Sequence, residues 1–275
     1  MANGLDVRPL CGAGGAEIFG VDLSRELDNA TAKAVHDAFV EHVAIFFPDQ
    51  HLGPADIERF TSRFGEPLVH PYLHPVEGSQ YVHELRKTPT DTVNFGNGWH
   101  ADVTFLARPS SANSLYARTG PAFGGDTVFI TTAMAYDALS DGMKKMLGGM
   151  RAVHRVHKRY LADVDTMANQ KGKVVDEQFI HPVIRTHPED GRKILYINPC
   201  FVPQFEDMTE EESRPILDYL TAFMTQPEFQ IRYNWSVDTF GIWDNRASLH
   251  TALNDYHGQL RVMHRMVVLE TSRPN

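Results

Sequence analysis

The sequence predicts a mainly β fold with helical inserts, in which one β-barrel or β-sandwich core forms a single domain. From residue 93 onward, short runs rich in β-branched and aromatic residues alternate with turn residues, as they do in all-β barrels and sandwiches. Amphipathic helical segments interrupt these runs, and such helices commonly pack outside a sheet. A chain of 275 residues, of which 42% are hydrophobic, is long enough to bury one core of this kind.

The segment before residue 93 contributes the first helices. A short strand pair precedes a helix that Asp28 or Asn29 caps, and this helix gives way to a strand at residues 43–47. A second helix is predicted to begin at Pro54 and to end at Gly65, because proline is favoured in the first turn of a helix and glycine just beyond its last turn.

The rest of the chain is predicted as strands with two helical inserts. The strand segments are ADVTFLA, SANSLYA, DTVFIT, IHPVIRTH, KILYIN, FQIRYNW, TFGIWD and RVMHRMVVLE. Two of them form a hairpin with Asp190 and Gly191 at its turn. The helical inserts are TAMAYDALSDGMKKML and TEEESRPILDYLTAFM, and the second opens with Thr209 and Glu212 at capping-box spacing. The polar, irregular segment 158–180 is the candidate for a lid over the site.

Composition opposes several classes of partner. The net charge of −9 and a pI near 5.8 disfavour sequence-independent binding to nucleic acid. No apolar run is long enough for a membrane span, and no secretory leader is evident. Cys11 and Cys200 are the only cysteines, which disfavours a disulfide framework and a thiolate zinc site. We therefore expect a cytoplasmic protein that binds neither nucleic acid nor membrane.

A candidate metal site begins with the pair His100-x-Asp102 in GNGWHADVTF. If this segment is a strand, the two side chains point to the same face. His250, in WDNRASLHTA, could complete the set from a neighbouring strand. Two imidazoles and one carboxylate on one face leave three coordination positions open, as in non-haem iron oxygenases. The alternative is that His100 and Asp102 form a polar pair at a strand edge.

Two arginines follow at a defined distance and strengthen the metal interpretation. Arg261 and Arg265 share one face of the predicted strand QLRVMHRMVV and have apolar neighbours. A buried arginine needs an anionic partner, and its planar fork can bind a carboxylate or a sulfonate through two hydrogen bonds. The pattern predicts two anion sites beside the metal, one for a cosubstrate and one for a substrate. The alternative is a solvated pair of arginines on an edge strand.

Taken together, these segments resemble the TauD/TfdA family of Fe(II)- and 2-oxoglutarate-dependent dioxygenases, and most of all its taurine dioxygenase branch. The likeness covers nearly the whole chain in order, through IFGVDLSRELD, FGEPLVHP, WHADVTF, GGDTVF, HPVIRTHP, PEFQIRYNW, WDNRASLH and RVMHR. It implies a double-stranded β-helix (jelly-roll) core in one domain, residues 1–275. It also implies Fe(II) as cofactor and 2-oxoglutarate and O2 as cosubstrates. The implied reaction is hydroxylation of a small anionic organic substrate with release of succinate and CO2. The resemblance further implies a homo-oligomer (dimer or tetramer).

The resemblance assigns roles to individual residues. His100, Asp102 and His250 match the catalytic iron ligands, and Thr127 and Arg261 match the residues that bind 2-oxoglutarate. The positions that match substrate-binding residues are His70, Tyr160, Phe201 and Arg265. Leu73 and Gly96 depart from the taurine branch, which has tyrosine and asparagine there. We expect the substrate to keep an anionic head but to have a larger or more apolar body, as in alkyl sulfonates, sulfate esters, aryloxy acids and N-substituted amino acids.

Three other functions compete with hydroxylation. The same cofactor chemistry could end in desaturation or in amine oxidation of an amino-acid-like substrate. A non-catalytic jelly roll could bind a small acid, although it would not need the complete triad. A zinc hydrolase could use the same triad, but it offers no role for Thr127 or Arg261. Outside the triad, His154 and His157 are predicted to lie at a solvated strand end.

Overall fold

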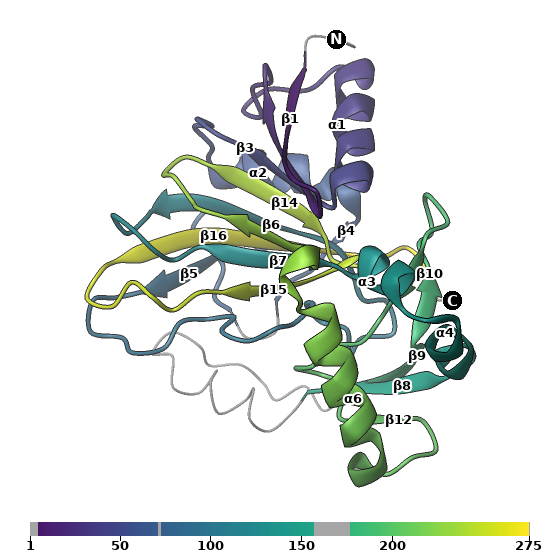
Figure 1. The fold of residues 1–275 in the computed structure, drawn as a ribbon. Helices are drawn as coiled ribbons and strands as arrows, with labels where there is room; N and C mark the ends of the chain where they lie inside the picture. The colour runs from purple at the N-terminus through teal and green to yellow at the C-terminus, as the bar shows by residue number, and fades with distance from the viewer. Residues whose placement is uncertain (1–4, 71–72, 157–176, 275) are drawn as a thin grey trace.

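The computed structural model describes residues 5–70, 73–156 and 177–274 (Figure 1). Tyr160, His157 and nearly all of the proposed lid segment lie outside these residues. The last part of that segment, from Gln178, belongs to a β-strand rather than to a loop.

A large sheet and a small sheet form the core. The large sheet has the strand order β1 (Asp6–Cys11), β2 (Gly14–Phe19), β3 (Ala44–Phe47), β14 (Phe240–Asp244), β6 (Ser110–Thr119), β16 (Arg261–Leu269) and β4 (Glu66–Pro67), with β5 (His83–Lys87) also paired to β16. The small antiparallel sheet has the order β13 (Gln230–Tyr233), β7 (Thr127–Thr131) and β15 (Ser248–Ala252).

The two sheets pack face to face through aromatic side chains. Phe46 of the large sheet stacks on Tyr233 of the small sheet with ring centroids 3.6 Å apart, and Trp243 meets Phe129 edge-on at 5.3 Å. These residues belong to one buried cluster. Side chains alternate along each strand, so the neighbours of these residues face outward and bury against helices. The mainly β, jelly-roll architecture predicted from the sequence is confirmed.

Helices cover the outer face of each sheet. The helices α1 (Asn29–His42) and α2 (Pro54–Thr61), the latter followed by η1 (Ser62–Phe64), pack on the large sheet. The helix α3 (Thr132–Ala138) packs on the small sheet, and α4 (Asp141–Leu147) and α6 (Glu210–Met224) join it in the same hydrophobic cluster, with η2 (Pro227–Phe229) after α6. Figure 1 shows the two helical groups on different sides of the strands. The core therefore has four layers, helices, large sheet, small sheet and helices, with the candidate site between the two sheets.

Two minor sheets complete the fold. One contains β12 (Gln204–Phe205), β8 (Arg151–Arg155) and β9 (Gln178–Pro182), and the other is the hairpin of β10 (Ile184–Thr186) and β11 (Lys193–Leu195). The hairpin predicted around Asp190 and Gly191 is confirmed, with Gly191 at φ +77° in its loop. Within the part of the chain that the structure describes, no helix has the length and apolar character needed to cross a membrane.

The predicted starts of the helices are confirmed because they depend on local hydrogen bonds, whereas the helix that begins at Pro54 ends at Thr61 and reaches Gly65 only through the 3-10 turn η1. Asp28 caps α1 by accepting from Thr31 N at 2.9 Å, and Thr209 and Glu212 form the capping box of α6. The first helical insert was predicted as one unit and is instead two helices. Ser140 separates them, since its hydroxyl accepts from Met143 N and caps α4. The strand predicted for ADVTFLA was wrong, because residues 102–105 form a turn.

Candidate metal centre and anion sites

Backbone pairing places His100 beside His250. His250 lies on β15, and its N–H donates to His100 O at 2.8 Å while His100 N–H donates to His250 O at 3.0 Å. This isolated bridge is the only regular structure at His100. The ring centroids of the two histidines are 4.2 Å apart. The prediction that a neighbouring strand supplies His250 is confirmed.

Asp102 reaches the two histidines from a turn, not from the strand that the His-x-Asp spacing predicted. The chain leaves the bridge after His100, and Val103 adopts φ +46°. Two buried asparagines hold this turn. Asn245 Oδ1 accepts from Asp102 N at 2.8 Å and its Nδ2 donates to Asp102 O at 3.0 Å, while Asn198 Nδ2 donates to Ala101 O at 2.8 Å. The carboxylate is therefore oriented by tertiary hydrogen bonds rather than by strand alternation.

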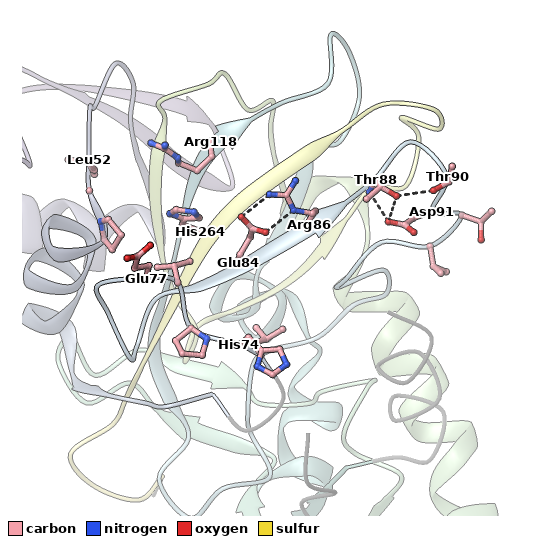
Figure 2. A pocket seen from close by; sticks show the side chains of 17 residues that line it. Leu52, His74, Glu77, Glu84, Arg86, Thr88, Thr90, Asp91, Arg118 and His264 are labelled. Atoms are coloured by element: carbon pink, nitrogen blue, oxygen red, sulfur yellow. Dashed lines mark hydrogen bonds and ion pairs between the residues drawn. The ribbon is translucent and has the colours of Figure 1, made fainter. Parts of the chain in front are cut away.

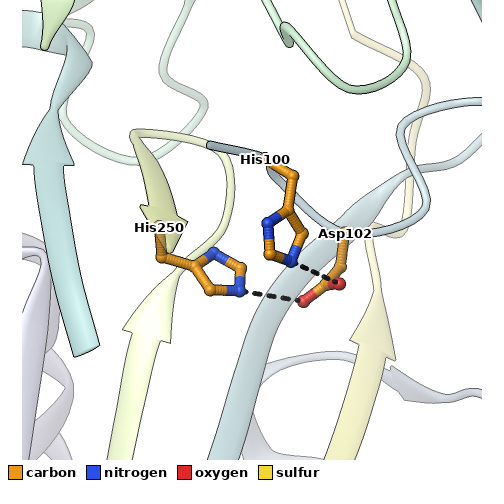
Figure 3. Close-up of side chains that lie close together, drawn as sticks. All are labelled: His100, Asp102 and His250. Carbon is orange, nitrogen blue, oxygen red and sulfur yellow. Dashed lines mark ion pairs between the residues drawn. The ribbon is translucent and has the colours of Figure 1, made fainter. Parts of the chain in front are cut away.

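His100, Asp102 and His250 converge on one point between the sheets (Figure 3). His100 Nε2 lies 3.8 Å from Asp102 Oδ1, and His250 Nε2 lies 3.6 Å from Asp102 Oδ2. His100 Nδ1 lies 2.8 Å from Gly98 O. In the tautomer with hydrogen on Nδ1, this nitrogen donates to the carbonyl, and the lone pair of Nε2 is available to a metal. Asp102 Oδ2 is buried and accepts no hydrogen bond from a described residue.

Electrostatics favour the protonation states that bind a divalent metal. Burial lowers the pKa of His100 and of His250, so both rings are neutral at neutral pH. Burial opposes ionisation of Asp102, but Arg265 together with the surrounding histidines outweighs it, and the pKa of Asp102 lies below its ordinary value. Two neutral imidazoles and a carboxylate, all buried, are a donor set that suits Fe(II).

Arg265 lies against the triad. Its Nη2 is 2.6 Å from Asp102 Oδ1, but the approach lacks hydrogen-bond alignment. Its guanidinium also lies 5.4 Å from the Phe95 ring centroid. His83 is its antiparallel cross-strand partner, and the ring of His70 lies 5.8 Å from that of His83. The anion site predicted at Arg265 therefore contains a cation and two imidazoles, all buried.

Arg261 occupies a second buried position on the same face of β16. Burial lowers its pKa, and Nη2 has no hydrogen-bond partner among the described residues. The backbone at Gly125 approaches it closely, since a Cβ there would lie 3.4 Å from Arg261 Cδ. Thr127 follows at the start of β7, and its hydroxyl accepts from Trp235 Nε1 at 2.9 Å. The Thr127 O–H can still donate to another acceptor.

Of the remaining predicted positions, Gly96 lies beside the triad. Gly96 has φ +81°, and a Cβ there would lie 3.3 Å from His100 Cε1, so the absence of a side chain leaves space beside the metal site. Leu73 is buried. Phe201 is buried in a cluster with Val103, the residue after Asp102. Tyr160 lies outside the described residues, so its predicted role in substrate binding stays a prediction.

A pocket of about 1090 Å³ lies on the opposite face of β5 and β16 (Figure 2). Glu84, Arg86 and His264 line it, and Glu84 is the cross-strand partner of His264. These residues alternate along the strands with His83 and Arg265. Because successive strand residues point to opposite faces, the pocket and the triad open on different sides of the sheet.

His154 is not on the solvated strand end predicted for it. It lies on β8 and is fully buried, with its ring 5.0 Å from that of His181 and 5.3 Å from that of Tyr196. Burial keeps its pKa well below the ordinary value. The residue is part of the packing between β8 and β9, and the charged neighbours in the sequence concealed this.

Four residues around the site were missed at the level of sequence. Asn245 and Asn198 hold the turn of Asp102, and His83 and Lys87 face Arg265 and Arg261 from β5. No local pattern marks the asparagines. A period-two signal was available for β5, since inward-facing His83, Leu85 and Lys87 alternate with Glu84 and Arg86.

Comparison with known proteins agrees with this geometry. A family model described as "Taurine catabolism dioxygenase TauD, TfdA family" matches residues 6–267. The chain is 35% identical over 272 residues to an alpha-ketoglutarate-dependent sulfate ester dioxygenase of Pseudomonas putida, covering 96% of this chain and 89% of that protein. It is 33% identical over 272 residues to an alkylsulfatase of Acinetobacter baylyi, covering 96% of this chain and 84% of that protein.

A solved structure gives the same result for the fold. The crystal structure of a putative alpha-ketoglutarate-dependent taurine dioxygenase from Burkholderia xenovorans matches with a TM-score of 0.83 and 31% sequence identity. The match covers 96% of this chain and 92% of that chain. The likeness therefore extends across both sheets and their helical layers.

Proposed function

The chain belongs to the TauD/TfdA family of Fe(II)- and 2-oxoglutarate-dependent dioxygenases, and on this premise we propose that it oxidises an organic sulfate ester or an alkyl sulfonate. The observation that carries the substrate class is the buried group of Arg265, His70 and His83 beside the triad. A sulfate or sulfonate head has three terminal oxygens, which suits several converging donors better than one guanidinium alone. The names of two relatives, a sulfate ester dioxygenase and an alkylsulfatase, support the same class.

We propose His100, Asp102 and His250 as the iron ligands. When bound there, Fe(II) together with 2-oxoglutarate supplies oxidation of a substrate C–H bond by O2, with release of succinate and CO2. The contribution of the chain is to hold the three donors. The backbone bridge fixes the two imidazoles, and Asn245 fixes the carboxylate through its backbone.

We propose Thr127 and Arg261 as the contacts of 2-oxoglutarate. A buried guanidinium with an unpartnered Nη2 is costly unless an anion binds it. The distal carboxylate of 2-oxoglutarate would supply that anion, and the hydroxyl of Thr127 would donate a further hydrogen bond. The 2-oxo acid end would then lie toward the metal.

We propose Arg265, His70, Phe201 and Tyr160 as substrate contacts. Arg265 would bind the anionic head, and the space beside Gly96 would admit a larger body than that of taurine. Hydroxylation at the carbon next to the ester oxygen of an alkyl sulfate gives a hemiacetal-like product. Its C–O bond to sulfate breaks as the new hydroxyl loses its proton, which releases an aldehyde and hydrogen sulfate.

Three further predictions belong to this proposal. We propose that residues 1–275 act as one domain, a view supported by a core cluster that contains both Leu5 and Val268. A dimer or tetramer and a cytoplasmic location stay predictions, which light scattering and cell fractionation would test.

An anaerobic absorbance titration tests the proposal. The protein is titrated with Fe(II), then 2-oxoglutarate, then a medium-chain alkyl sulfate, the matching alkyl sulfonate and an aryloxyalkanoic acid. We expect a weak visible charge-transfer band that needs both metal and cosubstrate, and a shift of that band with the sulfate or the sulfonate. A shift with the carboxylic acid alone would refute the substrate class, and no band with bound metal would refute the site. Zinc in place of iron should abolish turnover, unlike in a zinc hydrolase.

A further inference from the structure

The inner face of the β5–β16 ladder carries two cations at its Arg261 end. Arg261 of β16 and Lys87 of β5 are antiparallel cross-strand partners. Met263 and Leu85, the next residues on the same face, pack in the cluster between the two sheets. Side chains of directly paired residues stand next to each other on one face. Lys87 therefore points into the interior beside Arg261, unlike its neighbour Arg86, which lines the outer pocket.

Lys87 is buried without a carboxylate partner. Its exposed fraction is 4%. Its Nζ donates to Asn254 Oδ1, a neutral acceptor, at 2.8 Å and lies 4.1 Å from the centroid of the Tyr256 ring. The guanidinium of Arg261 lies 5.9 Å from the same ring. Among the described residues, neither cation forms an ion pair.

The nearby acidic side chains are engaged elsewhere. Asp91 Oδ2 accepts from the backbone and the hydroxyl of Thr88, at 2.7 and 2.9 Å. Asp255 Oδ1 accepts from Gly125 N at 2.7 Å. Asp126 accepts from Arg232 and Asn234, both at 2.6 Å. Asp91 and Asp255 still act on the charge of Lys87, and Asp126 acts on that of Arg261, but among the described residues none of them forms an ion pair with either cation. A buried cation without an ion pair is costly, and a bound anion would supply the partner that Arg261 Nη2 lacks.

We propose that Lys87 is a second cationic contact for the distal carboxylate of 2-oxoglutarate, facing Arg261 across the β5–β16 ladder; the inference rests on the proposed function. A carboxylate offers about four lone-pair sites on two oxygens, enough for a guanidinium, an ammonium and a threonine hydroxyl together. Lysine contributes as a compact charge, whereas arginine contributes a planar fork. The pair makes the site selective for 2-oxo acids with a distal carboxylate.

A purely structural role makes a different prediction. Lys87 also links to Asn254, whose Nδ2 donates to Thr92 O at 2.9 Å, so the lysine joins the segment after β5 to the segment after β15. If this link were its whole function, its loss would disturb the site without regard to the distal carboxylate. Binding of different 2-oxo acids would then weaken by the same factor.

The test is anaerobic calorimetric binding of 2-oxoglutarate and of 2-oxobutyrate, which lacks the distal carboxylate, to the metal-loaded protein. For Lys87→Met we expect the Kd of 2-oxoglutarate to rise roughly 10- to 100-fold, as for loss of one charged hydrogen bond. The Kd of 2-oxobutyrate should change by less than about 2-fold. Lys87→Arg keeps the positive charge and should retain most of the affinity for 2-oxoglutarate. If Lys87→Met is poorly folded, the binding constants of Lys87→Arg still test whether the charge is what the site needs.

Two control variants separate the possible outcomes. Arg86→Gln changes the adjacent residue on the outer face and should leave both Kd values unchanged. Asn254→Ala removes the link to Thr92 and the neutral acceptor of Lys87 but keeps the charge of the lysine, and it should preserve the preference for 2-oxoglutarate. Equal weakening of both acids in Lys87→Met, or no change in either, would overturn the inference. If the unsubstituted protein with bound metal fails to bind 2-oxoglutarate, the proposed function itself fails and this inference fails with it.

Discussion

The two buried arginines of β16 differ in how their charge is balanced. Arg265 lies 2.6 Å from the Asp102 carboxylate and faces the imidazole of His83 across the ladder. Arg261, at the first residue of β16 and on the same face, has no ion pair among the described residues and faces a second cation, Lys87. At one end of the strand the cation lies against a carboxylate, whereas the two cations at the other end have no ion pair among the described residues and a bound anion would supply one.

The difference assigns separate tasks to the two ends. At the Arg265 end, the cation lies against Asp102, which is also a candidate metal ligand. A bound metal would therefore compete with Arg265 for Asp102, and the anionic head of a substrate would compete with Asp102 for Arg265. At the Arg261 end, the site is organised for an anion before the anion arrives, and binding needs no internal ion pair to break. Preorganisation of this kind reduces the cost of binding.

The largest expected effect comes from the group that the Arg265 end shares with the metal. Asp102→Asn keeps the shape of the side chain, removes its charge and leaves Arg265 without a partner. We expect Fe(II) affinity to fall by at least about 100-fold, because even changes behind the ligands cost about 10- to 100-fold, and turnover to be lost. Metal titration and succinate release measure this. Asp218→Asn, on the exposed face of α6, is the control, and metal affinity near that of the control would refute the ligand assignment.

The charge balance itself is tested by the stability of the metal-free protein. Arg265→Met leaves the Asp102 carboxylate buried and unpaired, so we expect it to lower the free energy of unfolding by about 3–5 kcal/mol. Arg261→Met replaces a buried cation that has no ion pair among the described residues by an apolar side chain, so it should leave stability unchanged or raise it. Urea unfolding at pH 7 with a chelator present measures both. Equal destabilisation would break the comparison.

The two ends of β16 should also differ in the ligand whose binding each arginine supports. Arg261→Ala should weaken 2-oxoglutarate binding roughly 10- to 100-fold with little loss of Fe(II) affinity, because it removes charged hydrogen bonds to the distal carboxylate. Arg265→Ala should instead raise the KM for the organic substrate by a similar factor. Binding calorimetry and steady-state kinetics distinguish them. An unchanged Kd for 2-oxoglutarate in the first variant would contradict its assignment, as would normal substrate kinetics in the second.

A smaller effect should appear in the pH dependence of stability. Burial, and then Arg265, lower the pKa of His83 to about 4. Below its ordinary pKa near 6.5 the unfolded chain takes up a proton that the folded chain refuses, so stability falls as pH drops from about 6.5 to about 4. His83→Gln should make that decline shallower by roughly 1–3 kcal/mol over the window and leave stability above pH 7 on the same slope. Unfolding measured across this range with an unchanged slope would show that His83 is not held neutral.

Part of the fold and of the site could be predicted because the signals are short-range or depend on alternation. Asp28, Thr209 and Glu212 were identified as capping residues because each bonds to a backbone group within three residues. Arg261 and Arg265 were predicted to share a buried face because alternation along a strand holds wherever the strand is placed. The family resemblance supplied the roles of the triad, which spacing alone left open.

The part that could not be predicted depends on partners far apart in the chain. The His-x-Asp spacing predicted a strand, but the position of Asp102 is decided by Asn245, which is 143 residues away. The partners of Arg265 and Arg261 are His83 and Lys87 because β5 pairs with β16 in one register. Residue type and alternation thus determined from the sequence that Arg261 and Arg265 share a buried face and which chemistry such residues can perform. Only the packing of the two sheets decided which buried charges meet, because strand pairing depends on burying whole apolar faces rather than on the sequence near each charge.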